Sequence, residues 1–177
     1  IQISYDIQAG SYIERFNRDG VKKRAYCAKL AELINTLEPC DSILVAGVGE
    51  AITLCCTVPH LLLRPRYIGG FDISWSRLKY GSQFCEQQGI RGVELFVANM
   101  LNIPLADNSY DLVVTNHSLE PNGGYETEAI GELSRVARKY LLMNEPSFEF
   151  GNQEAREPID KQGYVKALAE HARSLGL

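Results

Sequence analysis

The feature that most constrains this chain is an alternation of short apolar segments with longer amphipathic ones. Residues 42–46 form an apolar run with β-branched members, which is followed by Gly47-Val48-Gly49 and by the helix-compatible residues 50–57. This order predicts a strand, a glycine turn and a helix. The same alternation continues. It predicts further strands at residues 67–73, 93–98, 111–115 and 140–144, and helices at residues 20–37, 75–88, 125–138 and 161–175.

Apolar strands separated by amphipathic helices require a parallel sheet that is covered on both faces, with right-handed crossovers. The expected fold is therefore α/β: a Rossmann-like, doubly wound, mostly parallel sheet with helices on both faces. Residues 99–109, which include Pro104, are too short and broken for a crossover helix, so we expect a loop on the ligand side of the sheet. We expect one domain over residues 1–177, in which residues 1–18 are an arm or lid and residues 20–177 the core.

Composition excludes several classes of function. The chain has 177 residues, of which 45% are hydrophobic, and its net charge is −4. This balance predicts a folded domain and argues against a nucleic-acid partner, which would require a basic face. No apolar run approaches the roughly 20 residues that cross a bilayer, so no membrane partner is expected either. The five cysteines lack CxxC spacing, which indicates neither disulfides nor a metal site and favours a reducing, cytoplasmic compartment.

The candidate binding residues follow predicted strands, and ligands of such sheets bind beyond the carboxyl ends of the strands. Gly47 and Gly49 allow a tight turn and a close approach of a ligand to the backbone. Asp72 ends the next strand of the core, where a carboxylate can accept both hydroxyl hydrogens of a ribose. A turn without a ligand remains the alternative for the glycines. A helix cap is the alternative for Asp72, although Ser74 is the better cap.

The glycine turn does not have the composition of a dinucleotide site. A third glycine is missing from the run that continues as Glu50-Ala51-Ile52, and Glu50 places a negative charge at the start of the helix. A pyrophosphate would be repelled there. The turn therefore favours a ligand with a ribose and an ammonium group over the nicotinamide cofactor of an oxidoreductase.

With these motifs the chain resembles the class I S-adenosylmethionine-dependent methyltransferases, especially their small-molecule branch. Residues 43–51 are similar to the family's first glycine motif, and residues 71–74 to its ribose-binding acidic position. Residues 99–113 are similar to its long loop and fourth strand, and residues 132–136 and 144–146 follow in the expected order. The resemblance covers about residues 40–148 and depends on order and spacing rather than on one motif.

The resemblance implies S-adenosylmethionine as the cofactor and assigns roles to individual residues. Gly47 and Gly49 would contact its methionine part, Asp72 its ribose, and Ile73 its adenine. Asn99 would face the adenine amino group beside the Met100 backbone. The implied cofactor-binding residues are Ala46, Gly47, Gly49, Glu50, Asp72, Ile73, Asn99, Met100 and Asn116.

Three positions depart from the family pattern. Asn99 stands where Asp is common, but its carbonyl oxygen can still accept a hydrogen bond from adenine. Ala51 replaces the third glycine, and Val45 replaces an acidic residue that would help to hold the cofactor ammonium, a role that Glu50 could assume. These departures keep open a second hypothesis, a catalytically degenerate domain that serves as a binding or scaffolding module.

Methyl transfer is a direct displacement, in which the protein mainly aligns the nucleophile and excludes water. The acceptor is expected to be a small molecule with an O, N or C nucleophile. If it must lose a proton, His117 at the end of the fourth strand is the candidate base, and Glu120 is a second. The alternatives are a histidine bonded to the backbone and a turn that shapes the acceptor pocket.

Members of the family usually add two further strands, and the sequence pattern after the fifth strand does not predict them. We therefore expect a chain that is truncated at its C-terminus. The exposed fifth strand would then need cover from a partner or from a missing segment.

Overall fold

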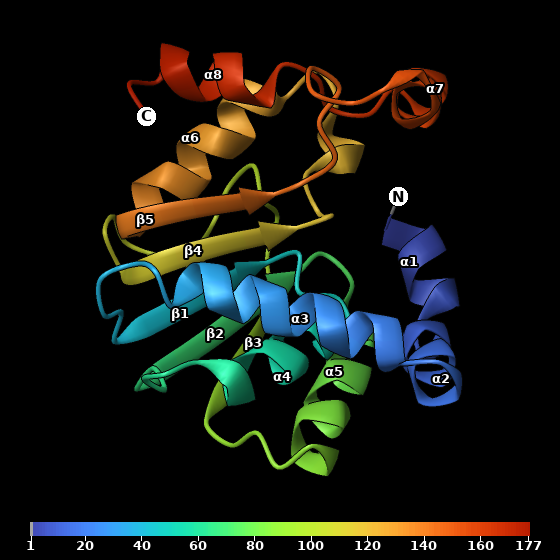
Figure 1. Ribbon diagram of the computed structural model, residues 1–177, viewed down its shortest axis with the longest axis vertical. Helices are drawn as coiled ribbons and strands as arrows, with labels where there is room; N and C mark the ends of the chain where they lie inside the picture. Colours follow the sequence, from blue (N-terminus) through green and yellow to red (C-terminus); the bar gives the residue numbers. More distant parts are fainter. Residues whose placement is uncertain (1) are drawn as a thin grey trace.

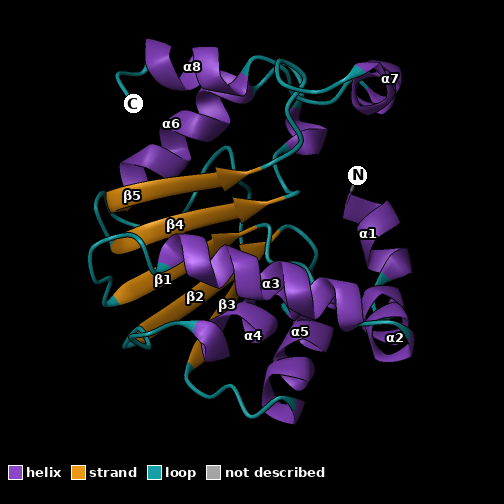
Figure 2. Ribbon diagram, in the orientation of Figure 1, coloured by secondary structure: helices purple, strands orange, loops and turns teal. Residues whose placement is uncertain are grey.

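A parallel five-stranded sheet forms the centre of the computed structural model, which describes residues 2–177 (Figures 1 and 2). The strand order is β3-β2-β1-β4-β5, so the order reverses between β1 and β4. This confirms the Rossmann-like α/β fold, and all five strands pair in parallel, without further strands in the described residues. The strands are β1 (Ser42–Ala46), β2 (Tyr67–Asp72), β3 (Val93–Val97), β4 (Tyr110–Asn116) and β5 (Ala137–Asn144).

Helices cover both faces of the sheet, as predicted (Figure 2). Neighbouring residues of one strand serve opposite faces: Leu44 packs with residues of α6 and α8, whereas Ile43 packs against Ile34 of α3. This alternation is what a strand buried on both sides requires. One layer contains α3 (Val21–Ile34), α4 (Ile52–Thr57) and α5 (Trp75–Gln87), and the other contains α6 (Glu126–Val136) and α8 (Leu168–Ser174).

The register brings the candidate residues to one edge of the sheet. Ala46 pairs with Phe71 of β2 and with Thr115 of β4. The glycine turn, Asp72 and the end of β4 therefore emerge at the same level. Asn116 pairs in turn with Asn144 of β5, which extends this edge to the last strand.

The N-terminal arm consists of two short helices at this edge, α1 (Gln2–Gln8) and α2 (Ser11–Arg18) (Figure 1). Gly10 separates them with a φ of 95°, a left-handed conformation that glycine adopts without steric cost. This break explains why residues 1–18 show no continuous helical period in the sequence.

Two predicted helix boundaries were wrong. The single helix predicted for residues 161–175 is two helices, α7 (Gln153–Gln162) and α8, because Gly163 ends α7 with a φ of 63°. The link between them is held by Val165, whose N–H donates to the Glu120 carbonyl at 3.1 Å. The helix predicted to reach residue 138 ends at Val136, and β5 begins at the next residue.

The chain also contains two short 3-10 turns, η1 (Val58–His60) after α4 and η2 (Glu120–Asn122) after β4. Cys55, Cys56 and Cys85 are buried in the core and form no disulfide. In the described part of the chain, none of the helices combines the length and apolarity that a bilayer crossing requires.

Candidate active site

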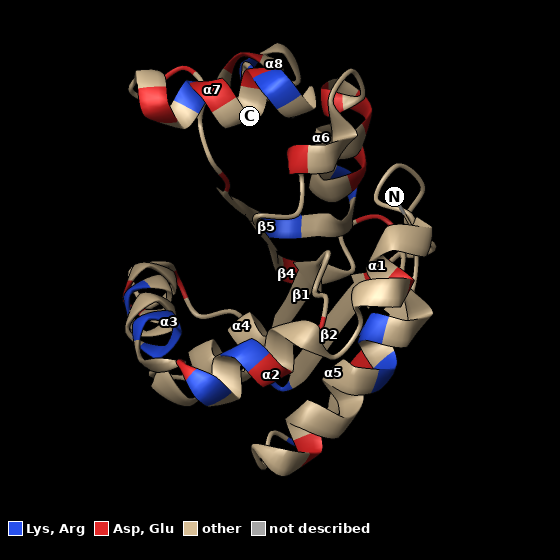
Figure 3. Ribbon diagram, turned by 90° about the vertical axis from the view of Figure 1, so that its right-hand side faces the viewer, with Lys and Arg blue, Asp and Glu red and all other residues tan. Residues whose placement is uncertain are grey.

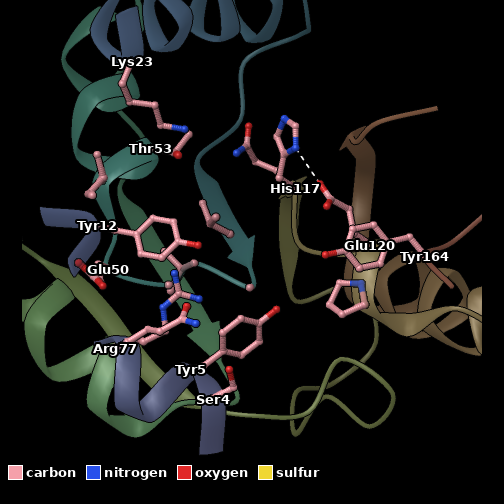
Figure 4. Close-up of a pocket in the computed structure, with 18 of the residues that line it drawn as sticks. Ser4, Tyr5, Tyr12, Lys23, Glu50, Thr53, Arg77, His117, Glu120 and Tyr164 are labelled. Carbon is pink, nitrogen blue, oxygen red and sulfur yellow. Dashed lines mark hydrogen bonds and ion pairs between the residues drawn. The ribbon is translucent and has the colours of Figure 1, made fainter. Parts of the chain in front are cut away.

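A cavity of about 850 Å³ opens at the carboxyl ends of β1 and β4 (Figure 4). Its walls come from the glycine turn, from α1 and α2, from the first turns of α4 and α5, and from residues that follow β4. Figure 3 shows the helices on either side, with α3 and α2 opposite α7. The cavity therefore lies at the reversal of strand order, where the fold predicts a ligand.

The glycine turn requires glycine at its first position for two reasons. Gly47 has a φ of 65°, and a Cβ there would stand 2.4 Å from the Cβ of Ser118. Ser118 is itself fixed, because its hydroxyl donates to the Ala46 carbonyl at 2.9 Å. Ala51, at the position of the missing third glycine, keeps the left-handed conformation with a φ of 57°. The turn thus retains the shape of a three-glycine motif.

Asp72 ties the end of β2 to the glycine turn. One carboxylate oxygen accepts the Gly49 N–H and the other accepts the Ser74 N–H, both at 2.9 Å. Ser74 is the cap of α5, as predicted, and its hydroxyl accepts the Arg77 N–H. Asp72 is 6% exposed, and each of its oxygens keeps a further lone pair.

Glu50 caps the N-terminal arm. Its two carboxylate oxygens accept the N–H groups of Gly10 at 2.9 Å and Ile13 at 2.8 Å. These groups lie in the first turn of α2, where a carboxylate satisfies free donors and complements the helix dipole. This role could not be predicted from local sequence, because the partners are about 40 residues away along the chain.

Arg77 is a site residue that the sequence analysis missed. Its guanidinium carbon lies 5.0 Å from the ring centre of Tyr5 and 4.7 Å from that of Tyr12. Its Nη2 lies 3.1 Å from the point where a Cβ of Gly49 would stand. Its Nε is buried and has no hydrogen-bond partner among residues 2–177. The guanidinium of Arg77 therefore faces the glycine turn, and its Nε can donate to a ligand. The sequence position of Arg77 in α5 does not distinguish it from an arginine on the protein surface.

The opposite side of the cavity is organised by an amide network at the ends of β4 and β5. Asn116 accepts two hydrogen bonds at its Oδ1, one from the Tyr26 hydroxyl and one from Asn144 Nδ2 at 3.1 Å. Asn144 also donates to the Tyr26 oxygen. The network fixes the orientation of the Asn116 amide, whose Nδ2 receives no partner within the described chain.

His117 and Glu120, the two candidate catalytic residues, lie together. His117 Nδ1 is 2.7 Å from Glu120 Oε1, so the ring bonds a carboxylate rather than the backbone. This hydrogen bond raises the pKa of His117. Its φ of 52° is left-handed, and its main-chain N–H donates to the Asn144 carbonyl. Nearby, burial raises the pKa of Glu145.

The cavity gathers some of the predicted site residues and leaves others outside its lining. Those that line it are Gly47, Gly49, Glu50, Asn116, His117 and Glu120. Asn99 instead accepts the Leu101 N–H within its own loop, and Met100 is buried. Those outside the lining are Ala46, Asp72, Ile73, Asn99 and Met100.

Comparison with known proteins identifies the family. A family model described as a methyltransferase domain matches residues 44–140, which is more than half of the 177-residue chain. The chain belongs to this methyltransferase family. The matched residues of this class I S-adenosylmethionine-dependent methyltransferase domain contain the glycine turn, Asp72 and the His117–Glu120 pair.

The curated relatives of the methyltransferase domain include demethylmenaquinone methyltransferases of Geobacillus stearothermophilus and Geobacillus kaustophilus. Each is 29% identical over 96 residues, which cover 50% of this chain and 41% of the relative. The chain therefore spans less than half the length of these relatives.

Solved structures share the fold at lower identity. A chain of the complex between the Trm112 methyltransferase activator and a methyltransferase of Haloferax volcanii has a TM-score of 0.75 at 15% identity, covering 98% of this chain and 76% of that one. The YcgJ protein of Bacillus subtilis has a TM-score of 0.65 at 18% identity, covering 86% and 67%. A SAM-dependent methyltransferase of Aquifex aeolicus has a TM-score of 0.53 at 20% identity, covering 63% and 60%.

Proposed function

We propose that this domain is an active S-adenosylmethionine-dependent methyltransferase that moves a methyl group to an O, N or C atom of a small molecule. The observation that carries the proposal is the bond between Asp72 and the Gly49 N–H. It joins the position implied for the ribose to the turn implied for the methionine part of the cofactor. A turn that served only to connect a strand with a helix would not need a buried carboxylate from the next strand.

The residues present suit the cofactor. The cavity has the volume of a cofactor site, and both Gly47 and Gly49 line it. Arg77 lines the cavity and its Nε has no hydrogen-bond partner among residues 2–177, which suits the carboxylate of the amino-acid tail. Glu50 lines the cavity with lone pairs for the ammonium group of that tail. Cofactor binding would also use Ala46, Gly47, Gly49, Asp72, Ile73, Asn99 and Met100, whereas Asn116 lies in the amide network on the opposite side of the cavity.

For a ribose to reach Asp72, helix α1 has to shift. Burial raises the pKa of Tyr5, and the Asp72 carboxylate adds a small contribution in the same direction. Asp6 holds α1 against α5 by accepting the Ser74 hydroxyl at 2.6 Å. We therefore propose that α1 opens to admit the cofactor and then closes over it, which excludes water from the site.

The bound cofactor would supply an electrophilic methyl group on a sulfonium. The residues of the chain then have to orient the acceptor and accept its proton. Because Glu120 binds His117 at Nδ1, the Nε2 atom of the ring is left to act as the base. Glu120 is a positioning residue in this scheme, since it acts through His117.

Calorimetric titration with S-adenosylhomocysteine tests the proposal, with NADH in parallel. We expect micromolar binding of S-adenosylhomocysteine, no response to NADH, and loss of binding in Asp72→Ala. Asp72→Asn, which keeps one acceptor oxygen, should weaken binding less. Asp19→Ala, at an exposed carboxylate, is the matched control and should bind normally. Failure of the folded wild-type chain to bind would contradict the proposal and favour the degenerate scaffold.

A further inference from the structure

We infer that the acceptor carries an acidic hydroxyl group, a phenol or an enol, which binds as its oxyanion between Lys23, Asn116 and His117. This inference rests on the proposed function, which it makes more specific. It follows from hydrogen-bond donors that the cavity presents on the side away from the glycine turn.

Lys23 brings an uncompensated positive charge to the cavity. It lines the cavity from α3, and in Figure 4 its ammonium ends beside Thr53, facing the side on which His117 lies. Its Nζ lies 4.7 Å from the ring centre of Tyr26, and no carboxylate of residues 2–177 forms an ion pair with it. Burial lowers the pKa of Lys23, which shows that the charge is partly desolvated. An anion in the cavity would compensate it.

Asn116 supplies a second donor next to this charge. The Tyr26 ring that lies under the Lys23 ammonium carries the hydroxyl that bonds Asn116 Oδ1. Because the oxygen of the amide is occupied twice, its Nδ2 is the group left for a ligand. Asn116 lines the cavity, and an oxyanion there would accept a hydrogen bond from this N–H₂ group.

His117 follows Asn116 directly and supplies a base beside the two donors. Glu120 hydrogen-bonds its ring and raises its pKa, and the charges of Glu145 and Lys23 act on that pKa in opposite directions. A carboxylate ligand would satisfy the donors, but it carries no proton at neutral pH and would leave the base without a function. A phosphate dianion would be poorly matched by one ammonium and a neutral amide. An acidic hydroxyl uses all three groups.

The reaction balances with the cofactor as the other reactant. The acceptor hydroxyl gives its proton to His117 Nε2, and Lys23 and Asn116 stabilise the oxygen anion. The oxygen lone pair then forms the bond to the methyl carbon while the carbon–sulfur bond breaks, and its electron pair remains on sulfur. The products are a methyl ether and S-adenosylhomocysteine, and His117 returns the proton to solvent.

Two probe molecules distinguish recognition of the hydroxyl group from recognition of the aromatic ring that carries it. 4-Nitrophenol changes its absorption when it ionises, and 4-nitroanisole is its methyl ether. We expect the protein to bind 4-nitrophenol about tenfold more tightly than 4-nitroanisole and to increase its phenolate absorption at fixed pH. Both titrations are run with and without S-adenosylhomocysteine.

Variants of the cavity residues test whether Lys23 and Asn116 bind the phenolate. Lys23→Gln and Asn116→Ala should each weaken 4-nitrophenol binding about tenfold and reduce the phenolate signal. Lys22→Gln, at the exposed neighbouring lysine, should change neither. Equal affinity for the two probes, no binding of either, or an unchanged phenolate signal in Lys23→Gln would overturn the inference. Tighter binding of 4-nitrobenzoate than of 4-nitrophenol would also overturn it, in favour of a carboxylate acceptor.

The outcomes for the two proposals are distinct. Selective 4-nitrophenol binding without S-adenosylhomocysteine binding supports the oxyanion site and contradicts the methyltransferase activity. Binding of S-adenosylhomocysteine by a protein that does not distinguish the two probes supports the activity and overturns the acceptor class.

Discussion

The two sides of the cavity are built differently. On the glycine-turn side, Asp72 and Glu50 each use both carboxylate oxygens to accept backbone N–H groups, and the turn is closely packed against Ser118. On the opposite side the hydrogen bonds of the amide network and of the His117–Glu120 pair join side chains. Within residues 2–177, Lys23 Nζ and Asn116 Nδ2 have no hydrogen-bond partner. On the first side two carboxylates hold backbone groups in place, whereas the second side is held by bonds between side chains. The first therefore suits a ligand common to a family, and the second suits an individual acceptor.

The largest expected effect comes from filling the space at Gly47. In Gly47→Ala the new Cβ meets Ser118 at 2.4 Å and the residue must keep a φ of 65°. We expect the free energy of unfolding to fall by about 2–4 kcal/mol and binding of S-adenosylhomocysteine to be lost. Chemical denaturation and calorimetry measure the two effects.

Gly131→Ala is the matched control, because nothing lies within 4 Å of a Cβ at this position in α6. It should stabilise the protein by about 0.5–1 kcal/mol and leave binding unchanged. Equal effects of the two substitutions would show that the glycine turn is not closely packed.

Removing the charge of Glu50 should loosen the arm. In Glu50→Gln an amide N–H₂ replaces one of the two acceptors, and one backbone N–H of α2 loses its partner at a cost of about 1–3 kcal/mol. We expect faster hydrogen exchange at the amides of Gly10 and Ile13. The exposed Glu32→Gln should leave both amides protected, and protection that survives in Glu50→Gln would refute the capping role.

The opposite side should respond to pH through His117. Its pKa is raised by Glu120, so the protonated pair stabilises the fold at low pH, and this contribution disappears as the pH rises through the pKa of the folded protein. The neutral form of His117, which can act as the base, becomes populated over the same rise in pH. The rate of methyl transfer should therefore increase over that range. In Glu120→Gln the pKa of His117 should move down toward its ordinary value. NMR titration of the imidazole and the pH profile of methyl transfer should shift together, and an unmoved titration would contradict the pairing.

The smallest effect is expected at Ala51, which holds a left-handed conformation without being glycine. Ala51→Gly should relieve strain and stabilise the protein by about 1 kcal/mol, which corresponds to an increase in melting temperature of about 2–4 °C. Ala25→Gly, at an exposed position within α3, should instead lower the melting temperature because glycine is a poor helix former. A lower melting temperature for Ala51→Gly would contradict the strain.

The parts of the molecule that depend on local pattern could be predicted from the sequence. The three central strands β1, β2 and β4 show their burial as apolar runs. Their alternation with helices determines the parallel order, so the ends of these strands could be placed at one edge. His117 and Glu120 were found because the order of motifs places them after β4.

Contacts between distant residues left no local signal. Glu50 meets Gly10 and Ile13 only after α2 folds back on the core, and Arg77 meets Tyr5 and Tyr12 in the same way. The break between α7 and α8 was missed because the apolar residues that predicted the helix, Val165, Leu168 and Leu175, all follow Gly163, which ends α7 with a φ of 63°.

The most direct test of a cavity with two distinct sides is an amide shift map recorded by NMR with each ligand in turn. S-adenosylhomocysteine should shift the amides of Gly47 and Gly49, while 4-nitrophenol should shift the Asn116 side-chain N–H₂ and the imidazole of His117. With both ligands present, the two sets of shifts should add. Shifts of the same residues by both ligands, or a glycine turn that does not respond to S-adenosylhomocysteine, would contradict the account.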